Sequence, residues 1–374
     1  MLKVLQITPS LLSGGIENVL YNYLLDIKQF EEFQIDFITH DEVGLVKDKL
    51  ESLSYAVHYV TPKKKSLFKY FRDLNNIFKI GEYDIVHVHQ NYMSFIPLFM
   101  ALLYKIKVRI VHVHGANIFE KGVTKLLHSI YGFFTNALAT DYWACGIDAG
   151  KWLYGNKKNV YYMRNAIDLN IFSYNASTNK QIRTHLEISD STTVIGHIAR
   201  FTEEKNHKFV IDIVKSLDSP NADFKFVFVG DGPLKSSIFE ELNNLGLLRY
   251  CLFTGNISNV YDYIQCFDIA LLPSLHEGFP VTVVEAQALG IPTLISNRIT
   301  DEVCMTNVVQ RLAIESPDLW VEYIRKCIEN KTRLNTHELM RSAGYDIEIE
   351  RTKLAKKYTE LYEVLMGTKG HKLK

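Results

Sequence analysis

The sequence has no excess of charge of either sign. Its 374 residues include 42 Lys plus Arg and 42 Asp plus Glu, so the formal net charge is zero. Proteins that bind nucleic acid usually carry a basic excess, because contacts to phosphate supply much of their affinity. We therefore expect no nucleic-acid partner. An apolar fraction of 47% with only 20 glycines and 9 prolines also excludes a disordered or low-complexity chain.

Cysteine is scarce, and long apolar runs are missing. No two of the five cysteines stand in a Cys-x-x-Cys spacing. They are Cys145, Cys251, Cys266, Cys304 and Cys327. This pattern argues against a disulfide framework or a zinc ribbon and fits a reducing compartment. The longest apolar stretch, residues 95–104, is about half as long as a membrane-spanning helix.

The N-terminal segment, MLKVLQITPS, is a strand-like alternation that runs into a turn, which is not the pattern of a signal peptide. We therefore expect a cytoplasmic protein, either free or peripheral at the inner face of the cell membrane.

Short β-branched runs alternate with helical patterns along most of the chain. The runs are four to seven residues long and apolar on both faces, as buried parallel strands are. The expected strands are residues 3–8, 34–39, 56–60, 85–89, 108–114, 142–145 and 160–163, then 194–198, 225–229, 251–254, 269–273 and 292–295. Helical patterns include residues 15–26, 207–217, 235–245 and 281–289. The alternation predicts an α/β fold with doubly wound parallel sheets.

The two series of strands predict two similar domains. A polar stretch over residues 173–191 separates them and is interpreted as a linker. We place an N-terminal domain at residues 1–170 and a C-terminal domain at residues 171–345. A charged helical pattern follows over residues 346–366, before a Gly/Lys tail.

The most informative segment is LLPSLHEGFPVTVVEAQALGIP, residues 271–292. A buried strand leads into a loop with Glu277, Gly278 and Phe279, and a helix follows. Open α/β sheets bind ligands at the carboxyl ends of their strands, and the N–H groups that begin a helix favour an anion. Glu277 and Glu285 would then flank an anion site. Their carboxylates would accept hydrogen bonds from ribose hydroxyls on one side of a diphosphate and from sugar hydroxyls on the other. The spacing alone fits equally well an alternative without a ligand, in which Glu277 is a surface loop residue and Glu285 a solvated helix residue.

A second candidate anchor is IGHIARFTEEKNH, residues 195–207. Arg200 stands at the tip of a strand, and Lys205 follows in the next loop. Two cations at the carboxyl end of a strand can neutralise a diphosphate, and Arg can do so with two hydrogen bonds. Because Glu203 and Glu204 are adjacent, a pair of surface cations is the alternative.

Glycine-rich turns follow two strands without matching a nucleotide-binding motif. LLSGGIEN contains Gly14 and Gly15, and VGDGPLK covers residues 229–235. Neither has the G-x-G-x-x-G pattern or the spacing of a Walker lysine. Glycine lets a backbone approach a ligand closely, although tight turns need glycine as well.

Four histidines form two pairs, His87 with His89 and His112 with His114. Alternation along a strand places each pair on one face. No third ligand or His-Glu-x-x-His helix accompanies them in the sequence pattern, so we expect core or strand-end histidines and no metal site. His114, at the end of its strand, is the one expected in a ligand-binding cleft.

Taken together, these segments resemble the retaining GT-B glycosyltransferases of family 4, and within them the bacterial exopolysaccharide and capsular-polysaccharide branch. The resemblance runs through SGGIEN, HVHG, NAIDLNIF, GHIARFTEEKNH, VGDGP and HEGFPVTVVEA. It implies two Rossmann-like domains that face a cleft, with the final helix, about residues 346–374, packing back on the first domain. It also implies metal-independent transfer, with retention, from a nucleotide-sugar to a saccharide or lipid-linked saccharide. A UDP-sugar is favoured over a GDP- or ADP-sugar, and no further cofactor is implied.

The resemblance also implies roles for single residues. Glu285 would bind the donor ribose, and Arg200 and Lys205 would hold the diphosphate. Gly15 would approach the diphosphate from the opposite domain.

Four further positions lie near the reacting sugar in the family pattern. Glu277 would lie beside the donor sugar, with Gly278 and Phe279 offering backbone N–H groups there. His114 matches the first-domain histidine near the reacting sugar.

Two other function classes remain open at this point. A nucleotide-sugar epimerase of the GT-B fold would convert the donor alone into a new sugar-nucleotide. A non-catalytic accessory subunit of polysaccharide assembly would be expected to have lost Glu277, Glu285, Arg200 or Lys205, and all four are present.

The neutral total conceals a local imbalance. Residues 60–130 hold 11 basic and 4 acidic side chains, interleaved with Phe, Leu and Tyr. Such a segment suits the surface of an anionic membrane, although a solvated helix face over a core would show the same pattern. The sequence therefore leaves two interpretations of residues 60–130: a contact with an anionic membrane surface, or an ordinary solvated helix face.

Overall fold

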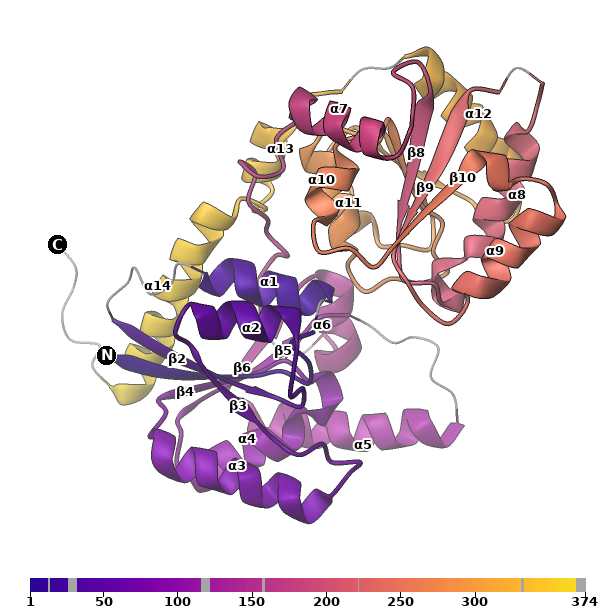
Figure 1. Ribbon diagram of the computed structural model, residues 1–374. Coiled ribbons are helices and arrows are strands. Elements are labelled where there is room, and N and C mark those ends of the chain that lie inside the picture. Colours follow the sequence, from indigo (N-terminus) through magenta and orange to yellow (C-terminus); the bar gives the residue numbers. More distant parts are fainter. Residues whose placement is uncertain are drawn as a thin grey trace. The chain divides into compact units, whose positions relative to one another are not determined.

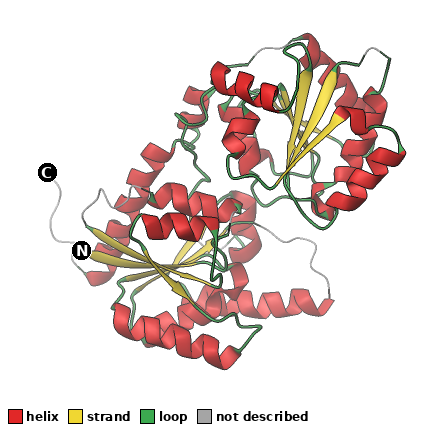
Figure 2. Ribbon diagram, viewed as in Figure 1, coloured by secondary structure: helices red, strands yellow, loops and turns green. Residues whose placement is uncertain are grey.

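The computed structural model describes residues 1–12, 14–25, 32–115, 122–156, 159–220, 222–330 and 333–367. The chain divides into two compact units, which we call the first unit, residues 1–166 with 346–374, and the second unit, residues 167–345. Each unit contains one parallel sheet between helices (Figures 1 and 2). The expected α/β class with two Rossmann-like sheets is therefore confirmed.

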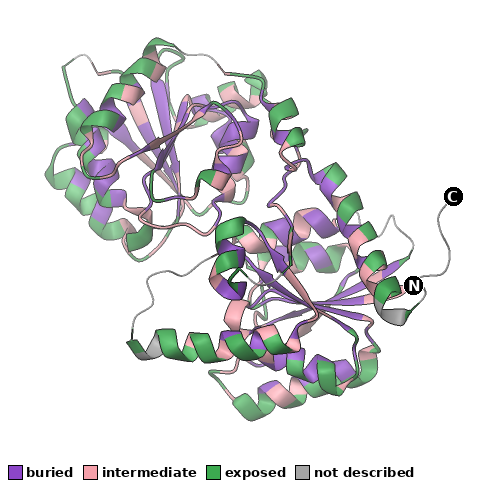
Figure 3. Cartoon of the chain, turned by 180° about the vertical axis from the view of Figure 1, so that it is seen from behind, coloured by how far each residue is buried: buried purple, intermediate pink, exposed green. Residues whose placement is uncertain are grey.

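The sheet of the first unit has seven parallel strands in the order β3-β2-β1-β4-β5-β6-β7. The strands are β1 (Leu2–Ile7), β2 (Phe33–Thr39), β3 (Ala56–Tyr59), β4 (Ile85–Val88), β5 (Val108–Val113), β6 (Asp141–Ala144) and β7 (Val160–Tyr162). The order reverses between β1 and β4, which is the switch point where doubly wound sheets bind ligands. The central strands are largely buried on both faces, which explains why most of their residues are apolar (Figure 3).

Helices cover both faces of this sheet. They are α1 (Gly15–Leu24), α2 (Leu45–Ser52), α3 (Leu67–Gly81), α4 (Phe95–Leu103), α5 (Gly122–Leu138), α6 (Ile147–Tyr154) and α14 (Ile347–Met366). Helices α3, α4 and α5 lie on the face opposite α1 and α2 (Figure 1). The last helix, α14, returns to this unit and packs against α1, where Arg351 donates a hydrogen bond to the Asn22 carbonyl at 2.8 Å.

The sheet of the second unit has six parallel strands in the order β10-β9-β8-β11-β12-β13. The strands are β8 (Thr193–Ile198), β9 (Phe224–Val229), β10 (Cys251–Gly255), β11 (Ile269–Leu272), β12 (Thr293–Ser296) and β13 (Val309–Leu312). The helices are α7 (Ala176–His185), α8 (His207–Leu217), α9 (Lys235–Asn244), α10 (Val260–Ile264), α11 (Val281–Ala288), α12 (Asp318–Glu329) and α13 (His337–Ser342). The switch point lies between β8 and β11, which are hydrogen-bonded neighbours.

Two features of the second unit differ from the expectations. The polar stretch interpreted as a linker contains α7, which Asn175 caps by accepting hydrogen bonds from two backbone N–H groups. Arg183 of α7 is buried and forms an ion pair with Asp268 at 2.8 Å, so this helix belongs to the unit. Strand β13 was not expected, because its sequence, VQRL, is half polar and only one of its residues is buried.

Candidate active site

Two neighbouring strands deliver the charged residues of the second unit to one edge of its sheet. In the paired strands β8 and β11, Ile195 lies opposite Ile269 and Gly196 opposite Ala270. The loops that follow them, residues 199–206 and 273–280, therefore begin side by side. Backbone and side-chain bonds join these loops, since Leu275 N–H donates to the Glu204 carbonyl at 2.8 Å and Asn206 donates to the Pro273 carbonyl at 3.1 Å.

Lys205 and Glu277 meet across these two loops. The Lys205 ammonium lies 2.6 Å from Oε1 and 2.7 Å from Oε2 of Glu277. Ser274 donates a further hydrogen bond to Oε1 at 2.7 Å. The Glu277 side chain is 9% exposed and that of Lys205 is 22% exposed, so water screens this pair only weakly. Sequence reasoning placed both residues at one sheet edge but did not predict the pair, and it missed Ser274.

Arg200 stands at the tip of β8 and is exposed, and no ion pair of its guanidinium is found among the described residues. The backbone on either side of it is held by the glycine turn after β9. Phe201 N–H donates to the Asp231 carbonyl, and Leu234 N–H donates back to the Phe201 carbonyl, both at 3.0 Å. Gly230 has φ of 137°, and a Cβ there would lie 2.2 Å from the Ala199 carbonyl oxygen. The turn at residues 229–235 thus supports Arg200.

The loop after β11 ends at helix α11, whose N-cap is Pro280. Within the described part of the chain, the backbone N–H groups of Gly278, Val281 and Thr282 have no hydrogen-bond partner, so they remain available to an anion. Phe279 is 7% exposed, and its ring stacks on Tyr345 with centroids 6.0 Å apart. The Phe279 ring therefore anchors the loop to the unit.

Glu285 lies in the second turn of α11 and is half-buried. Burial raises the pKa of its carboxyl to about 8. Among the described residues, no hydrogen bond or ion pair of this carboxyl offsets the cost of burial, in contrast to Glu277. An acidic group that is desolvated and unpaired is typical of a ligand-binding position.

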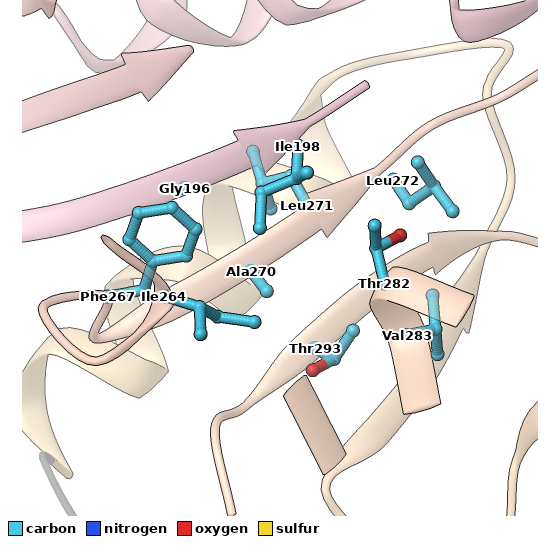
Figure 4. A pocket seen from close by; sticks show the side chains of 10 residues that line it. All are labelled: Gly196, Ile198, Ile264, Phe267, Ala270, Leu271, Leu272, Thr282, Val283 and Thr293. Atoms are coloured by element: carbon cyan, nitrogen blue, oxygen red, sulfur yellow. The ribbon is translucent and has the colours of Figure 1, made fainter. Parts of the chain in front are cut away.

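A small pocket lies behind α11, among strands β8, β11 and β12 (Figure 4). Leu272 and Ile198 line it at the strand ends, and Thr282 lines it from the helix. All its lining residues are apolar or glycine except two threonines. This pocket is therefore unsuited to a charged diphosphate, which leaves the polar loops above the strand ends as the candidate site.

Two of the expected site residues belong to the first unit. Gly15 is the first residue of α1, the helix that follows β1, and His114 follows the last residue of β5. Because β1, β4 and β5 are parallel neighbours, both residues lie at the carboxyl edge of this sheet. His114 is 8% exposed, and burial lowers the pKa of its imidazole to about 3, so the ring is neutral at pH 7.

His114 is one of four buried histidines on β4, β5 and the residues that follow them. Its Nε2 is 2.8 Å from Nδ1 of His89, and Nε2 of His87 is 3.2 Å from Nδ1 of His112. Nitrogens of His87, His89 and His112 lie within 4.8 Å of one another, which is close enough for a shared metal ion. The sequence did not indicate this group of three histidines, because His87 and His89 lie on one strand and His112 on another.

Comparisons with known proteins identify the family and the fold. Residues 178–346 match the family described as Glycosyl transferases group 1. EpsF of Bacillus subtilis (strain 168), which is named as a glycosyltransferase, is 30% identical over 92% of this chain and 93% of its own length. The capsular polysaccharide biosynthesis glycosyltransferase CapH of Staphylococcus aureus is 24% identical over 96% of this chain and 99% of its own.

Solved structures share the whole fold. HepE of Anabaena, crystallised with UDP and glucose, superposes with a TM-score of 0.80 over 96% of this chain and 100% of its own, at 17% identity. WaaG, a glycosyltransferase involved in lipopolysaccharide biosynthesis, gives a TM-score of 0.73 at 14% identity, over 94% of this chain and 98% of its own. The two Rossmann-like sheets are those of the GT-B fold, and the chain belongs to the group 1 glycosyltransferases.

Proposed function

We propose that this protein transfers a sugar from a UDP-sugar to a hydroxyl of a growing, lipid-linked surface polysaccharide, with retention of anomeric configuration. The observation that carries the proposal is the contrast at one sheet edge between the paired Glu277 and the unpaired, desolvated Glu285. Two carboxylates in such different settings suit two different parts of one ligand. Crystal structures of HepE with UDP and with UDP-glucose support a uridine nucleotide.

In this proposal Glu285 binds the ribose hydroxyls. Its carboxyl lacks a partner in the described structure, and a ribose would supply two hydrogen-bond donors. The diphosphate lies against Arg200, Lys205 and the free N–H groups at the start of α11, and Gly15 approaches it from the first unit. These groups place positive charge where the leaving diphosphate becomes more negative.

Glu277 orients the sugar end of the donor together with the N–H groups of Gly278 and Phe279. Because Lys205 holds both oxygens of Glu277, this lysine fixes the carboxylate as well as facing the phosphate. In the reaction, the bond between the anomeric carbon and the diphosphate oxygen breaks while the acceptor oxygen bonds to the same face of that carbon. The acceptor proton passes to the departing diphosphate oxygen. No metal ion is required, since Arg200, Lys205 and the N–H groups supply the charge.

The lipid-linked acceptor is proposed from the relatives. One of them, from Escherichia coli, is named UDP-Gal:alpha-D-GlcNAc-diphosphoundecaprenol alpha-1,3-galactosyltransferase and is 25% identical over 77% of this chain and 78% of its own. No helix of the described chain combines the length and apolar character needed to cross a bilayer. In this proposal, the lipid of the acceptor holds it at the membrane surface, and the enzyme meets it there.

A surface of the first unit fits that contact. We call it the apolar face: the large exposed apolar residues of α3, α4 and α5, which are Leu67, Phe68, Ile80, Phe99, Leu102, Leu103, Leu126, Leu127, Ile130, Phe133 and Phe134. The three helices pack side by side on one face of the sheet. Exposed lysines accompany them, among them Lys64, Lys65 and Lys125, which suits anionic lipid.

Lys63 is an exception within the expected basic segment. Its ammonium lies 3.1 Å from the Gln90 side-chain oxygen and 5.1 Å from the Tyr70 ring centre, and burial lowers its pKa to about 8. It therefore belongs to the interior of the unit and not to a membrane contact.

A donor panel tests the proposed function. UDP-, GDP- and ADP-sugars are added singly to the protein, and binding is measured by calorimetry and by the rise in melting temperature. We expect a UDP-sugar to stabilise the protein and to lose its sugar to an acceptor extract, with activity unchanged by EDTA. Conversion of the donor alone into a second sugar-nucleotide would support the epimerase, and the absence of binding by all three would support the accessory subunit.

A further inference from the structure

The loop before α11 is held by side chains on either side of Gly278. On one side, the Glu277 carboxylate is bonded to Lys205. On the other side, the ring of Phe279 stacks on that of Tyr345, with centroids 6.0 Å apart and planes inclined by 14°. Gly278 itself bonds to no other backbone group in the described part of the chain. The direction of its N–H therefore depends on what holds its two neighbours.

Tyr345 gives the Phe279 ring a fixed surface. It is buried, and its backbone is bonded on both sides. Its N–H donates to the Met340 carbonyl at 3.0 Å, and its carbonyl accepts from the Ile167 N–H at 3.1 Å. Ile167 and Tyr345 are the first and last residues of the second unit, so this bond ties the two ends of the unit together. A densely packed ring with a bonded backbone leaves its neighbour little room to slide.

The segment that ends at Tyr345 also supports the other end of α11. Leu334 N–H donates to the Gly290 carbonyl, two residues beyond the end of that helix, at 3.3 Å. Gly290 has φ of 65°, and a Cβ there would lie 1.9 Å from the Leu334 carbonyl oxygen. Helix α13 of this segment packs beside α11 (Figure 1). Residues 334–345 therefore support α11 behind its last turn and the loop before its first.

We propose that Tyr345 is a positioning residue that, through the ring of Phe279, aims the N–H of Gly278 at the sugar of the bound donor. This inference rests on the proposed function, in which Gly278 and Phe279 face the sugar end of the donor. Tyr345 itself touches no part of the donor. The groups proposed for the ribose and the diphosphate belong to α11 itself or to the loop after β8, so they do not depend on the ring stack.

The stack matters because a hydrogen bond weakens steeply as its donor turns away from the acceptor. Tyr345→Leu removes the flat surface under Phe279 and lets this part of the loop move, and ordering a mobile loop on binding costs free energy. Tyr345→Phe keeps the ring and removes only the hydroxyl. UDP lacks the sugar, so a loss confined to the Gly278 N–H should appear as a difference between UDP and a UDP-sugar.

Backbone NMR of glycine-labelled, donor-free protein tests the first part of the inference. The Gly278 amide signal is assigned as the one lost in Gly278→Ala. We expect its order parameter to be about 0.85 in the native protein and in Tyr345→Phe, and below about 0.6 in Tyr345→Leu. The signals of Gly196 and Gly230, elsewhere in the second unit, are internal references and should not change.

Calorimetry with UDP and with the UDP-sugar selected by the donor panel tests the second part. In Tyr345→Leu the Kd for UDP should stay within about twofold of the native value, whereas the Kd for the UDP-sugar should rise by about tenfold, the scale of one lost hydrogen bond. Tyr345→Phe should bind both as the native protein does. Phe279→Leu removes the other ring of the stack and is the second variant if Tyr345→Leu does not fold, with the same expected results.

The matched control is Tyr250→Leu. Tyr250 is also buried in the second unit, and it stacks on Phe224 with ring centroids 4.5 Å apart. Phe224 is the first residue of β9, so this stack lies at the opposite, amino-terminal edge of the same sheet. The control should change neither the Gly278 signal nor the difference between the two Kd values.

A mobile Gly278 in the native protein, or a rigid one in Tyr345→Leu, would overturn the inference. An unchanged Kd for the UDP-sugar, an equal loss of affinity for UDP, or the same changes in Tyr250→Leu would also overturn it. The NMR result needs no donor. A native protein with a rigid Gly278 that binds no UDP-sugar would therefore reject only the proposed function.

Discussion

Lys205 holds both carboxylate oxygens of Glu277, at 2.6 and 2.7 Å, across two loops that are 72 residues apart in the chain. If either residue is removed, the other keeps a charge that is largely buried and has lost its ion-pair partner. Removing Lys205 leaves Glu277 with Ser274 as its remaining side-chain donor among the described residues. The pair is therefore best regarded as one unit at the carboxyl edge of the second sheet.

We expect Glu277→Ala and Lys205→Ala each to lower kcat/KM by about a hundredfold or more, on the scale of losing an electrostatic contact to the transition state. The double variant should cost little more than either single one, since residues that act together are not additive. The control is Lys326→Ala, which breaks a 2.6 Å pair with Glu322 on exposed α12 and should leave activity unchanged. Activity of Glu277→Ala within a few-fold of the native protein would sink its assignment.

The raised pKa of Glu285 predicts that donor binding depends on pH. At about 8, this pKa leaves the carboxyl mostly protonated at neutral pH, while the ribose hydroxyls need a carboxylate as acceptor. Donor affinity should therefore rise with pH, by up to about tenfold per pH unit below the pKa, and level off above it. Calorimetry in two buffers of different ionisation enthalpy should show one proton released on binding. Glu285→Gln should bind weakly with no such pH dependence, and a retained dependence would contradict the assignment.

The same group makes stability depend on pH in a defined direction. Its pKa in the folded protein lies above the ordinary value of 4.5, so its contribution to stability is fully present below that value and is lost as pH rises through about 8. Glu285→Gln keeps a neutral side chain at every pH. It should raise the melting temperature at pH 8 and change it little at pH 5, whereas Glu322→Gln on the exposed face of α12 should do neither.

The packing around Gly196 of β8 leaves no room for a side chain, so we expect its replacement by a larger residue to destabilise the second unit. A Cβ there would lie 2.0 Å from the ring of Phe267, which is fully buried. Gly196→Ala should destabilise the second unit by about 1–3 kcal/mol, the usual cost of overpacking. The control is Gly132→Ala in α5, where the nearest atom to a new Cβ is 3.7 Å away. That change should stabilise by about 0.5–1 kcal/mol. Thermal unfolding of both variants makes the comparison, and similar effects would refute the packing argument.

The strands, and the position of Glu277 at the carboxyl end of one of them, could be predicted because their signals are local. Buried parallel strands leave apolar runs, and the loop with Glu277 follows one of them directly. Strand β13 was not predicted, because this edge strand has the sequence VQRL, which contains no apolar run. The bond between Lys205 and Glu277, and still more that between His87 and Tyr358, 271 residues apart, have no local signal. The first forms only when β8 and β11 pair in the second unit, and the second only when the returning helix α14 packs on the first unit.

The apolar face of the first unit predicts binding to anionic membranes. Exposed Phe and Leu on α3, α4 and α5 lie beside lysines, so vesicles with anionic lipid should bind the protein and neutral vesicles should not. Phe133 is 69% exposed, and Phe133→Glu should lower the partition coefficient by about tenfold, because it removes an apolar contact and adds a repelled charge. Co-sedimentation measures the change.

The control for the membrane prediction is Phe239→Glu on α9 of the second unit, where the side chain is 48% exposed. It adds the same charge outside the apolar face and should leave binding unchanged. Added salt should weaken binding to anionic vesicles, since exposed charges are screened within about 10 Å at 0.1 M. An equal loss of vesicle binding in both variants would mean that net charge, and not the apolar face, controls binding. If the native protein bound neither kind of vesicle, the apolar face would be an ordinary helix surface.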